Sequence, residues 1–422
     1  MREMKDSGAE WIGYIPSNWQ IRKIGQMYYE RRTKVNDIDF PPLSVTMKGV
    51  LPQIEGVAKT DAHDNRKLVL KGDFAINSRS DRRGACGIAD RDGSVSLINI
   101  VLQPREGMNP SFLNWLFHTS MFADEFYRNG QGIVDDMWTT KWDDMKRISI
   151  PFPNLKIQSR IASFLDSHIA KIDDSIARYK ALSDKLDEYR YNIISKITCV
   201  GIREDRLFMP LNNEFLDKLP KNWEYKRLKF TSVEIFKGDG ITKDEVDVNG
   251  NIPCIRYGEI YSRYNIACSK CYSLTNLEVH TSPKYAVYGD LLFAGTGELI
   301  EDIGKNIVYL GSQPCLVGGD IIVVRHKQNP KFLSYALSSH YARAQKSKGK
   351  SKLKVVHISA SEIGNIRVAI PPLDEQAEIV AYLDKKCSVI DNSKDKIEII
   401  IKKLEEYKKS LIYNAVTGKI EL

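Results

Sequence analysis

Residues 150–166 of the chain read IPFPNLKIQSRIASFLD, and residues 370–384 read IPPLDEQAEIVAYLD. In both stretches an Ile-Pro pair is followed by Gln, Ile, an aromatic residue, Leu and Asp, in the same order. Beyond the prolines, apolar residues recur every three or four positions, which is the spacing of one face of an α-helix. The two stretches therefore predict two related helices, in a chain that contains one structural unit twice.

Three further pairs of short stretches recur in the same order along the two halves. Asn followed by Pro is typical of a helix start, because Asn caps the first turn and Pro fits the first helical position. Gly-Asp before an apolar run indicates a turn that leads into a strand. The pairs are IPSNW at 15–19 with LPKNW at 219–223, KGDFA at 71–75 with YGDLL at 288–292, and NPSFL at 109–113 with NPKFL at 329–333.

The two predicted helices are long, and Pro and Gly are absent from Leu155 to Val200. Each helix must bury its apolar row, and the two rows match at one constant offset, so we expect an antiparallel coiled coil with one globular domain at each end. A helix of ~40 residues spans roughly 60 Å, more than the ~34 Å turn of B-DNA. The residues predicted to pack are Ile161, Leu165, Ile172, Leu186 and Tyr189, with Ile379, Leu383, Ile390, Leu404 and Tyr407.

The segments before the helices mix short strand-like runs with one predicted helix each, which begins at Pro110 in one segment and at Pro330 in the other. Val95 to Leu102 and Asp320 to Val324 are examples of predicted strands. The predicted fold class is α/β, with two globular domains of mixed short strands and helix, separated by two long helices. The predicted boundaries are 1–152 for the first globular domain, 153–205 for the central helix, 206–372 for the second globular domain and 373–422 for the C-terminal helix.

Two loops of the globular domains are strongly basic, which favours contact with a polyanion. Arginine suits bidentate contact with guanine edges, whereas lysine suits phosphates. Asn and Gln in the loop at 128–132 have the side chains that pair with adenine. A solvated surface loop is the alternative for each. The candidate DNA-binding residues are Arg79, Arg82, Arg83, Asn129 and Gln131 in the first domain, and Lys346, Lys348, Lys350, Lys352 and Lys354 in the second.

The composition is that of a globular protein, with a formal net charge of +8 that suits a polyanionic partner without requiring one. The seven cysteines suggest no disulfide framework. The N-terminal residues do not resemble a signal peptide, and no run of about 18 apolar residues predicts a membrane span. We therefore expect a cytoplasmic protein that does not contact a membrane.

The motifs of several enzyme classes are missing. Residues 293–298, FAGTGE, imitate the cofactor loop of an S-adenosylmethionine-dependent adenine methyltransferase, but no Asp or Asn precedes either Pro-Pro pair, as the catalytic motif requires. No phosphate-binding loop of an ATP-driven motor is present. Cys268 and Cys271 form one CxxC motif without a second pair, which is weak evidence for zinc. We expect a binding protein with no catalytic residues, no metal and no cofactor of its own.

The chain resembles the specificity subunit of type I restriction-modification systems. The resemblance rests on the Ile/Leu-Pro-x-Asn-Trp openings, on IPPLDEQ at 370–376, and on AVTGKI at 415–420. The central copy departs from this pattern, because it lacks the Glu before Gln158 and the ending at 197–201 is degraded.

The resemblance implies that each globular domain is a target recognition domain that reads one half of a bipartite, asymmetric DNA target. The helices would set the spacer between the halves and dock two methyltransferase subunits, and restriction subunits would complete the assembly. S-adenosylmethionine, ATP and Mg²⁺ would belong to those partners. Three alternatives remain: the specificity subunit of a Type IIB restriction enzyme, a stand-alone DNA adenine methyltransferase or nuclease, and a coiled-coil assembly factor without affinity for DNA.

Overall fold

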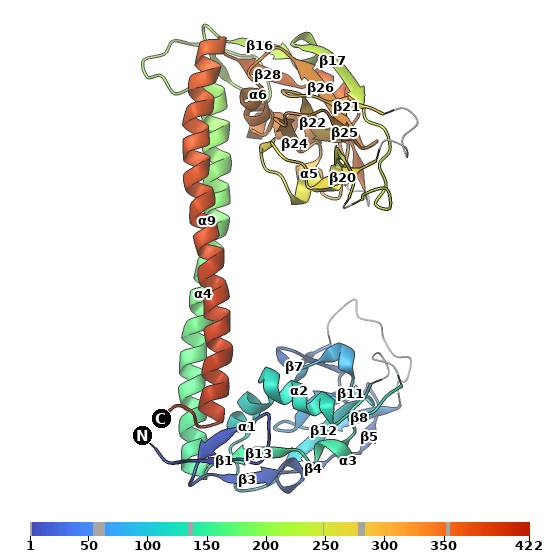
Figure 1. Ribbon diagram of the computed structural model, residues 1–422, viewed down its shortest axis with the longest axis vertical. Helices are drawn as coiled ribbons and strands as arrows, with labels where there is room; N and C mark the ends of the chain where they lie inside the picture. Colours follow the sequence, from blue (N-terminus) through green and yellow to red (C-terminus); the bar gives the residue numbers. More distant parts are fainter. Residues whose placement is uncertain (1, 54–63, 134–137, 248, 277–282, 352–354) are drawn as a thin grey trace. The chain divides into compact units, whose positions relative to one another are not determined.

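The computed structural model describes residues 2–53, 64–133, 138–247, 249–276, 283–351 and 355–422. The chain forms two compact units. The first unit consists of residues 1–180 and 398–422, and the second consists of residues 181–397. Each unit therefore combines one globular domain with part of both long helices, whereas the predicted domains follow one another along the chain. Figure 1 labels the elements of both units.

The first globular domain is built on two sheets and three short helices (Figure 1). One sheet has the order β10-β9-β12-β4, from Cys86–Ile88, Phe74–Asn77, Asn99–Pro104 and Tyr28–Glu30, and the other has the order β11-β8-β5, from Gly93–Ser96, Arg66–Val69 and Lys34–Val35. Paired strands are β1 (Met4–Asp6) with β2 (Tyr14–Pro16), β3 (Gln20–Lys23) with β13 (Ser149–Phe152), and β6 (Leu43–Thr46) with β7 (Gly49–Pro52). The helices are α1 (Pro110–Phe117), α2 (Ser120–Arg128) and α3 (Trp142–Met145), with 3₁₀ turns η1 (Ile24–Gln26) and η2 (Ser80–Arg82).

The second globular domain has a larger pair of sheets (Figure 1). One has the order β17-β26-β22-β24-β19, from Ser232–Lys237, Ile321–His326, Leu291–Ala294, Asn306–Tyr309 and Ala267–Cys268, and the other has the order β20-β18-β25-β21, from Ser273–Thr275, Ile252–Ile255, Cys315–Val317 and Tyr285–Ala286. Paired strands are β14 (Phe208–Pro210) with β15 (Lys218–Pro220), β16 (Glu224–Arg227) with β28 (Arg367–Ile370), and β23 (Thr296–Gly297) with β27 (Val356–His357). The helices are α5 (Tyr257–Ser262), α6 (Pro330–Leu337), α7 (His340–Ser347) and α8 (Ala360–Asn365), with 3₁₀ turns η4 (Leu228–Phe230) and η6 (Ile300–Asp302).

The predicted repeat is confirmed by the order of these elements. α1 and α6 begin at the predicted prolines, and the side chains of Asn109 and Asn329 cap them by accepting the amide protons of Phe112 and Phe332. The predicted strand from Asp320 to Val324 is confirmed in β26. The predicted strand from Val95 to Leu102 is wrong in its continuity, because a turn at 97–98 divides it between β11 and β12.

The Gly-Asp stretches form the same turn in both domains. Gly72 and Gly289 have φ angles of 92° and 93°, a region that favours glycine. The carboxylates of Asp73 and Asp290 then accept hydrogen bonds from the backbone amides of Leu70 and Val287, three residues earlier. The turn leads directly into a strand, β9 or β22, whose first three residues are buried.

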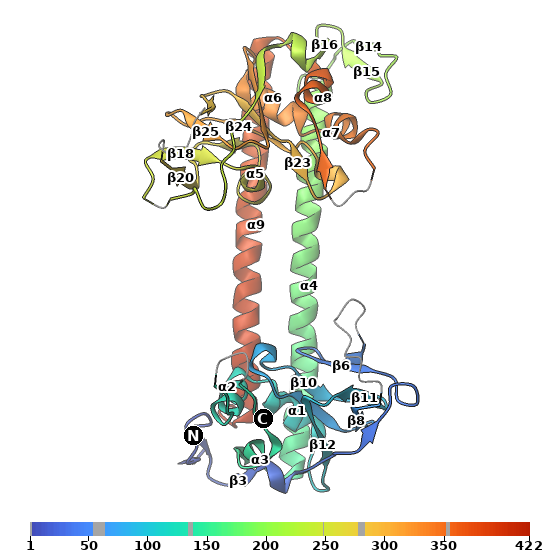
Figure 2. The same ribbon diagram turned by 90° about the vertical axis from the view of Figure 1, so that its right-hand side faces the viewer.

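The long helices are α4 (Leu155–Val200) and α9 (Leu373–Val416), as predicted. In the second unit they run antiparallel, since Asp187 pairs with Lys394 and Arg190, three residues later, pairs with Asp391, three residues earlier. In the first unit, Lys408 Nζ lies 2.6 Å from Asp173 Oδ1. Figure 2 shows the two helices side by side. Each long helix therefore has the other as a partner against which its apolar row can be buried.

The packing of the predicted row is more varied than expected. Ile161, Leu165 and Ile172 lie in the core of the first globular domain, and Ile379 and Leu383 lie in the core of the second. Ile390 is also buried, and Leu186 and Leu404 are half-buried. The prediction was wrong for Tyr189 and Tyr407, which are 51% and 55% exposed. A tyrosine ring with its hydroxyl group does not need burial, so periodicity alone does not decide its orientation.

The shared residue order of 150–166 and 370–384 is explained by the junction between each long helix and its globular domain. The buried amide of Gln158 accepts a hydrogen bond from Asn109 N and donates one to Pro153 O, both at 2.8 Å. Gln376 makes the same two bonds, with Asn329 N and Pro371 O, at 2.9 and 2.8 Å. Each glutamine thus joins the capped end of a short helix to the first turn of a long one.

The glutamate that the central copy lacks has a visible role in the second unit. Glu375 is fully buried, accepts a hydrogen bond from Trp223 Nε1 at 3.2 Å, and pairs with Arg206. The residue before Gln158 is Ile157, which cannot accept a hydrogen bond. Correspondingly, Trp19 Nε1 is buried without a hydrogen-bond partner among the described residues. The departure in sequence therefore changes one polar contact and leaves the junction in place.

No helix in the described part of the chain is both long and apolar enough to cross a membrane.

Candidate nucleic-acid interface

The first basic loop forms η2 and its flanks, at the end of the buried strand β9. Arg79, Arg82 and Arg83 are all exposed. The backbone carbonyl of Arg79 accepts a hydrogen bond from Tyr127 Oη at 2.5 Å, which fixes the start of the loop. The Arg83 guanidinium lies 5.1 Å from the centre of the same tyrosine ring. One buried tyrosine of α2 thus supports a loop whose arginine side chains remain accessible.

The structure brings the predicted residues of two separate stretches together. Thr139 pairs through its backbone with both Arg79 and Gln131 in isolated β-bridges. Gln131 is exposed beside the arginine loop. Asn129 is less available, because its amide donates to the carbonyl oxygen and to a carboxylate oxygen of Glu125, at 2.9 and 3.0 Å. The arginines and Gln131 therefore form one polar surface of the first globular domain.

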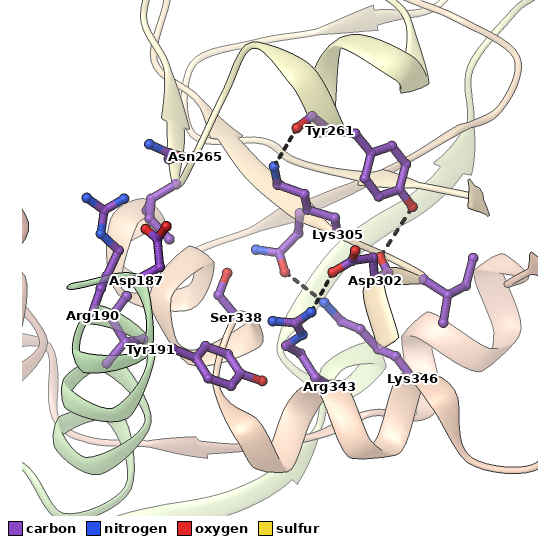
Figure 3. Close-up of a pocket in the computed structure, with 14 residues that line it drawn as sticks. Asp187, Arg190, Tyr191, Tyr261, Asn265, Asp302, Lys305, Ser338, Arg343 and Lys346 are labelled. Carbon is purple, nitrogen blue, oxygen red and sulfur yellow. Dashed lines mark hydrogen bonds and ion pairs between the residues drawn. The ribbon is translucent and has the colours of Figure 1, made fainter. Parts of the chain in front are cut away.

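The prediction for Lys346 is wrong, because its side chain is buried in the second globular domain. Its amine donates hydrogen bonds of 2.7 to 2.8 Å to Gly304 O, Leu337 O and Asn306 Oδ1. Burial lowers the pKa of this amine well below its ordinary value. Lys346 and Arg343, both labelled in Figure 3, are among the residues that line a cavity of about 580 Å³. With three acceptors already engaged, the amine has no proton left for DNA.

Two other lysines of the second loop, Lys348 and Lys350, lie at or near the surface. Lys348 is exposed, pairs with Glu214 and lies over the Phe215 ring. Lys350 is less exposed and pairs with Glu362. An anion that binds these lysines must either displace the two carboxylates or bind beside them. The other two predicted residues, Lys352 and Lys354, lie outside the described residues.

The same loop-to-helix ion pair occurs in both globular domains with its charges exchanged. In the first, Arg83 after η2 pairs with Asp124 of α2, at 2.8 Å between Nη2 and Oδ1. In the second, Asp302 of η6 pairs with Arg343 of α7, at 2.6 Å between the same atom types. The contact holds equivalent elements together, while the loop charge is opposite in the two domains. The framework is thus repeated and the exposed surface is not.

Comparison with known proteins supports the resemblance. Residues 220–403 match the family described as "Type I restriction modification DNA specificity domain". The chain is 24% identical to the type I restriction enzyme MjaVIII specificity subunit of Methanocaldococcus jannaschii over 97% of this chain and 94% of that protein. It is 23% identical to the EcoKI specificity subunit of Escherichia coli over 76% of this chain and 68% of that protein. The second half of the chain thus matches the DNA specificity domain of type I restriction-modification systems, and nearly the whole chain is similar to a type I specificity subunit.

Solved structures show that the fold is also that of this family. A chain from a study of complex assembly and conformational transition of the type I R-M system matches with a TM-score of 0.72, at 16% identity, over 96% of this chain and 99% of that chain. The HsdS subunit from Thermoanaerobacter tengcongensis matches with a TM-score of 0.52, also at 16% identity, over 96% of this chain and 98% of its own. The predicted fold class is therefore confirmed.

The structure also contains a second basic surface that the sequence did not predict. This surface is a groove in the second globular domain, lined by Lys237, Lys243, Arg256 and Arg263. These residues come from the end of β17, from the loop after it, and from the two ends of α5. No single stretch concentrates them, so a search for runs of charge cannot find the groove. One local signal for the groove is present in the sequence. It is a lysine at the end of a strand, followed later by an arginine before a short helix.

The CxxC motif lies in the core of the second globular domain. Cys271 Sγ is 3.4 Å from Cys315 Sγ, and Cys254 and Cys268 are buried nearby in the sheets. Burial raises the pKa of Cys254 to about 12, which keeps its thiol protonated. Among the described residues, no group of three or more His, Cys, Asp or Glu side chains is placed to hold a metal ion.

Replacing Lys346 by Met is expected to destabilise the second unit by about 3 kcal/mol, because three buried acceptors would lose their donor and each costs about 1–3 kcal/mol before relaxation. Urea unfolding of the full-length chain measures the effect. Lys348→Met is the matched control, and its exposed side chain should change stability by less than about 0.5 kcal/mol. A stable Lys346→Met variant with weakened DNA binding would restore Lys346 as a contact residue.

Proposed function

We propose that this specificity subunit reads a bipartite, asymmetric DNA target, with one half assigned to each globular domain. The observation that carries the proposal is the charge-exchanged ion pair, Arg83 with Asp124 and Asp302 with Arg343. A duplicated frame whose equivalent loop and helix carry opposite charges in the two domains suits two different sequences. Base edges in the major groove are told apart by donors and acceptors at such loops.

The helices are proposed to set the spacer and to dock two methyltransferase subunits. α4 follows β13 of the first globular domain without a break and ends shortly before β14 of the second. Its length therefore enters the distance between the two half-targets. Each helix also exposes a tyrosine at the same position of the repeat, Tyr189 in α4 and Tyr407 in α9. Two equal positions suit two copies of one partner.

The chain is proposed to act by binding alone. S-adenosylmethionine, ATP and Mg²⁺ are then bound by the methyltransferase and restriction subunits of the complex. A stand-alone adenine methyltransferase is the alternative from the enzyme class, and calorimetric titration of the full-length chain with S-adenosylmethionine separates the two. Stoichiometric binding to the isolated chain would contradict the subunit assignment. A Type IIB specificity subunit would differ in its partner, which fuses nuclease and methylase, and co-purification from the host identifies that partner.

Exchanging residues 10–151 for the equivalent stretch of another specificity subunit is expected to change one half of the methylated target and to leave the other half intact. The reason is that each globular domain has its own core and its own exposed loops. Methylome sequencing of cells that carry the parent or the exchanged chain measures both halves at once. A change in both halves would contradict the assignment of one half to each domain.

DNA binding by the assembled complex is expected to fall steeply with salt, because lysine and arginine contacts to phosphates release counterions. A plot of log affinity against log salt concentration measures this with a duplex that carries the methylated target. The coiled-coil assembly factor predicts a flat line. A flat line would therefore remove the DNA-binding function.

A further inference from the structure

The second globular domain contains a basic groove of about 930 Å³ that the basic loops do not include. Lys237, Lys243, Arg256 and Arg263 line it, whereas its acidic side chains are Glu259 and Asp320. It lies around α5 and the start of β20, which Figure 1 shows close together in this domain. The first domain has the short strands β5, β6 and β7 at this point of the chain order. The groove therefore belongs to the part in which the two domains differ.

Arg256 lies in the wall of the groove with an unused donor. Its Nε is buried and has no hydrogen-bond partner among the described residues. Its Nη2 is 3.8 Å from Glu259 Oε1, which is too long for a hydrogen bond. Glu259 is already engaged, because its Oε2 accepts from Arg256 N and its Oε1 accepts from Ser273 Oγ. A buried donor that lacks a partner costs about 1–3 kcal/mol, so an incoming acceptor would be favoured here.

The other cations of the groove are accessible. Lys243 and Arg263 are exposed, and Arg263 lies 5.2 Å from the centre of the Tyr272 ring, which is 65% exposed. Lys237 pairs with Asp320, with its Nζ 3.6 Å from Oδ1. The groove therefore holds more positive charge than its own carboxylates neutralise. A groove of this charge attracts an anion that is long enough to meet several cations at once.

Glycines make the groove deep. A side chain at Gly238 would lie 2.3 Å from the carbonyl oxygen of Gly318, so these two segments are in backbone contact. Gly240 and Gly258, on the open side, would meet no atom within 4 Å. Glycine backbone thus forms part of the wall, beside the side chains of the cations and tyrosines. A bulky ligand can approach this wall closely.

A concave, basic groove suits the DNA backbone better than the bases. The phosphates are the outermost part of a duplex, whereas base edges lie at the floor of its grooves and are reached by protruding elements. We propose that this groove binds the phosphate backbone beside the half-target read by the second globular domain, with Lys243, Arg256 and Arg263 as the phosphate contacts. This inference rests on the proposed function.

A smaller hollow continues the groove toward the predicted basic loop. It has a volume of about 330 Å³ and shares Lys237 and Asp320 with the groove. Thr296, His357 and Glu362 also line it, and Glu362 pairs with Lys350. The groove and the described part of the basic loop, residues 346–351, are therefore neighbours on one domain. Contacts that fix the position of the duplex would lie next to side chains that can reach its bases.

The test measures binding of the assembled complex to two labelled duplexes across a range of salt concentrations. One duplex carries the target found by methylome sequencing and the other carries it scrambled. Lys243→Gln and Arg263→Gln are each expected to weaken binding to both duplexes by the same factor and to reduce the salt slope by about one. Adding Arg256→Gln should reduce the slope by about one more. Lys226→Gln is the matched control, since Lys226 lies on β16, outside the groove, and pairs with Glu224.

The outcomes separate the groove from the wider function. An unchanged slope in the Lys243→Gln/Arg263→Gln variant, with target preference intact in the parent, overturns the groove and leaves the proposed function standing. A changed ratio between the two duplexes at an unchanged slope also overturns it, since the cations would then read bases. A flat salt dependence in the parent overturns both. Lys243 and Arg263 are exposed, so their variants test the groove even where Arg256→Gln fails to fold.

Discussion

Tyr189→Ala is expected to lose one of two methyltransferase subunits from the assembled complex, and Tyr407→Ala is expected to lose the other. The two side chains occupy the same position of the repeat and are 51% and 55% exposed, although they belong to helices that bury most of their apolar residues. An exposed tyrosine is a frequent anchor of a protein interface, and its truncation there costs about 2–4 kcal/mol. This corresponds to a loss of affinity of roughly 30- to 1,000-fold.

Light scattering of the co-purified complex measures the number of partners for each chain. The parent should bind two, each single variant one, and the double variant none. Val389→Ala is the matched control. Val389 lies on α9, as Tyr407 does, and is 60% exposed, but its counterpart in the repeat is Lys171, so the two helices do not share an apolar residue at this position. Two bound partners in the double variant would exclude the tyrosines as anchors. Loss of both partners from one single variant would contradict independent docking at two equivalent sites.

The framework of this protein could be predicted from its sequence because the repeated residues are structural. Asn109 and Asn329 cap helices, and Gln158 and Gln376 join those caps to the long helices. Such roles depend on neighbours close in the chain or on one fixed partner, so they appear as fixed spacings. The starts of α1 and α6 were therefore predicted correctly, and α4 lies within the predicted range 153–205.

The binding surface could be predicted only in part, because it depends on which way a side chain points. The arginines near η2 and Gln131 lie together as a surface. Lys346 belongs to the same kind of basic run, yet it lies in the last turn of α7 on the buried face of that helix, where three acceptors hold it. Arg256 was not predicted, since the groove brings it together with Lys237 and Lys243 only through folding. The composition gives the number of charged residues but not the direction in which each side chain points.

Inserting one helical turn of four residues into both long helices is expected to lengthen the spacer of the target and to leave its two half-sequences unchanged. Four residues add about 6 Å to a helix, which is close to two base pairs at about 3.4 Å each. The apolar row steps by three or four, so a four-residue insertion keeps it continuous. Insertion after Ile172 in α4 and after Lys408 in α9 keeps Asp173 and Lys408 paired.

Methylome sequencing reads the spacer and both half-sequences of this insertion variant directly. A second helical turn at the same two places should lengthen the spacer again by a similar step, because each added turn contributes the same rise. The control carries the same added residues after Leu422, where they lengthen the chain but neither helix. An unchanged spacer, or altered half-sequences, would show that the distance between the half-targets is set elsewhere than in α4 and α9. A stepwise spacer would tie it to the rise of these two helices.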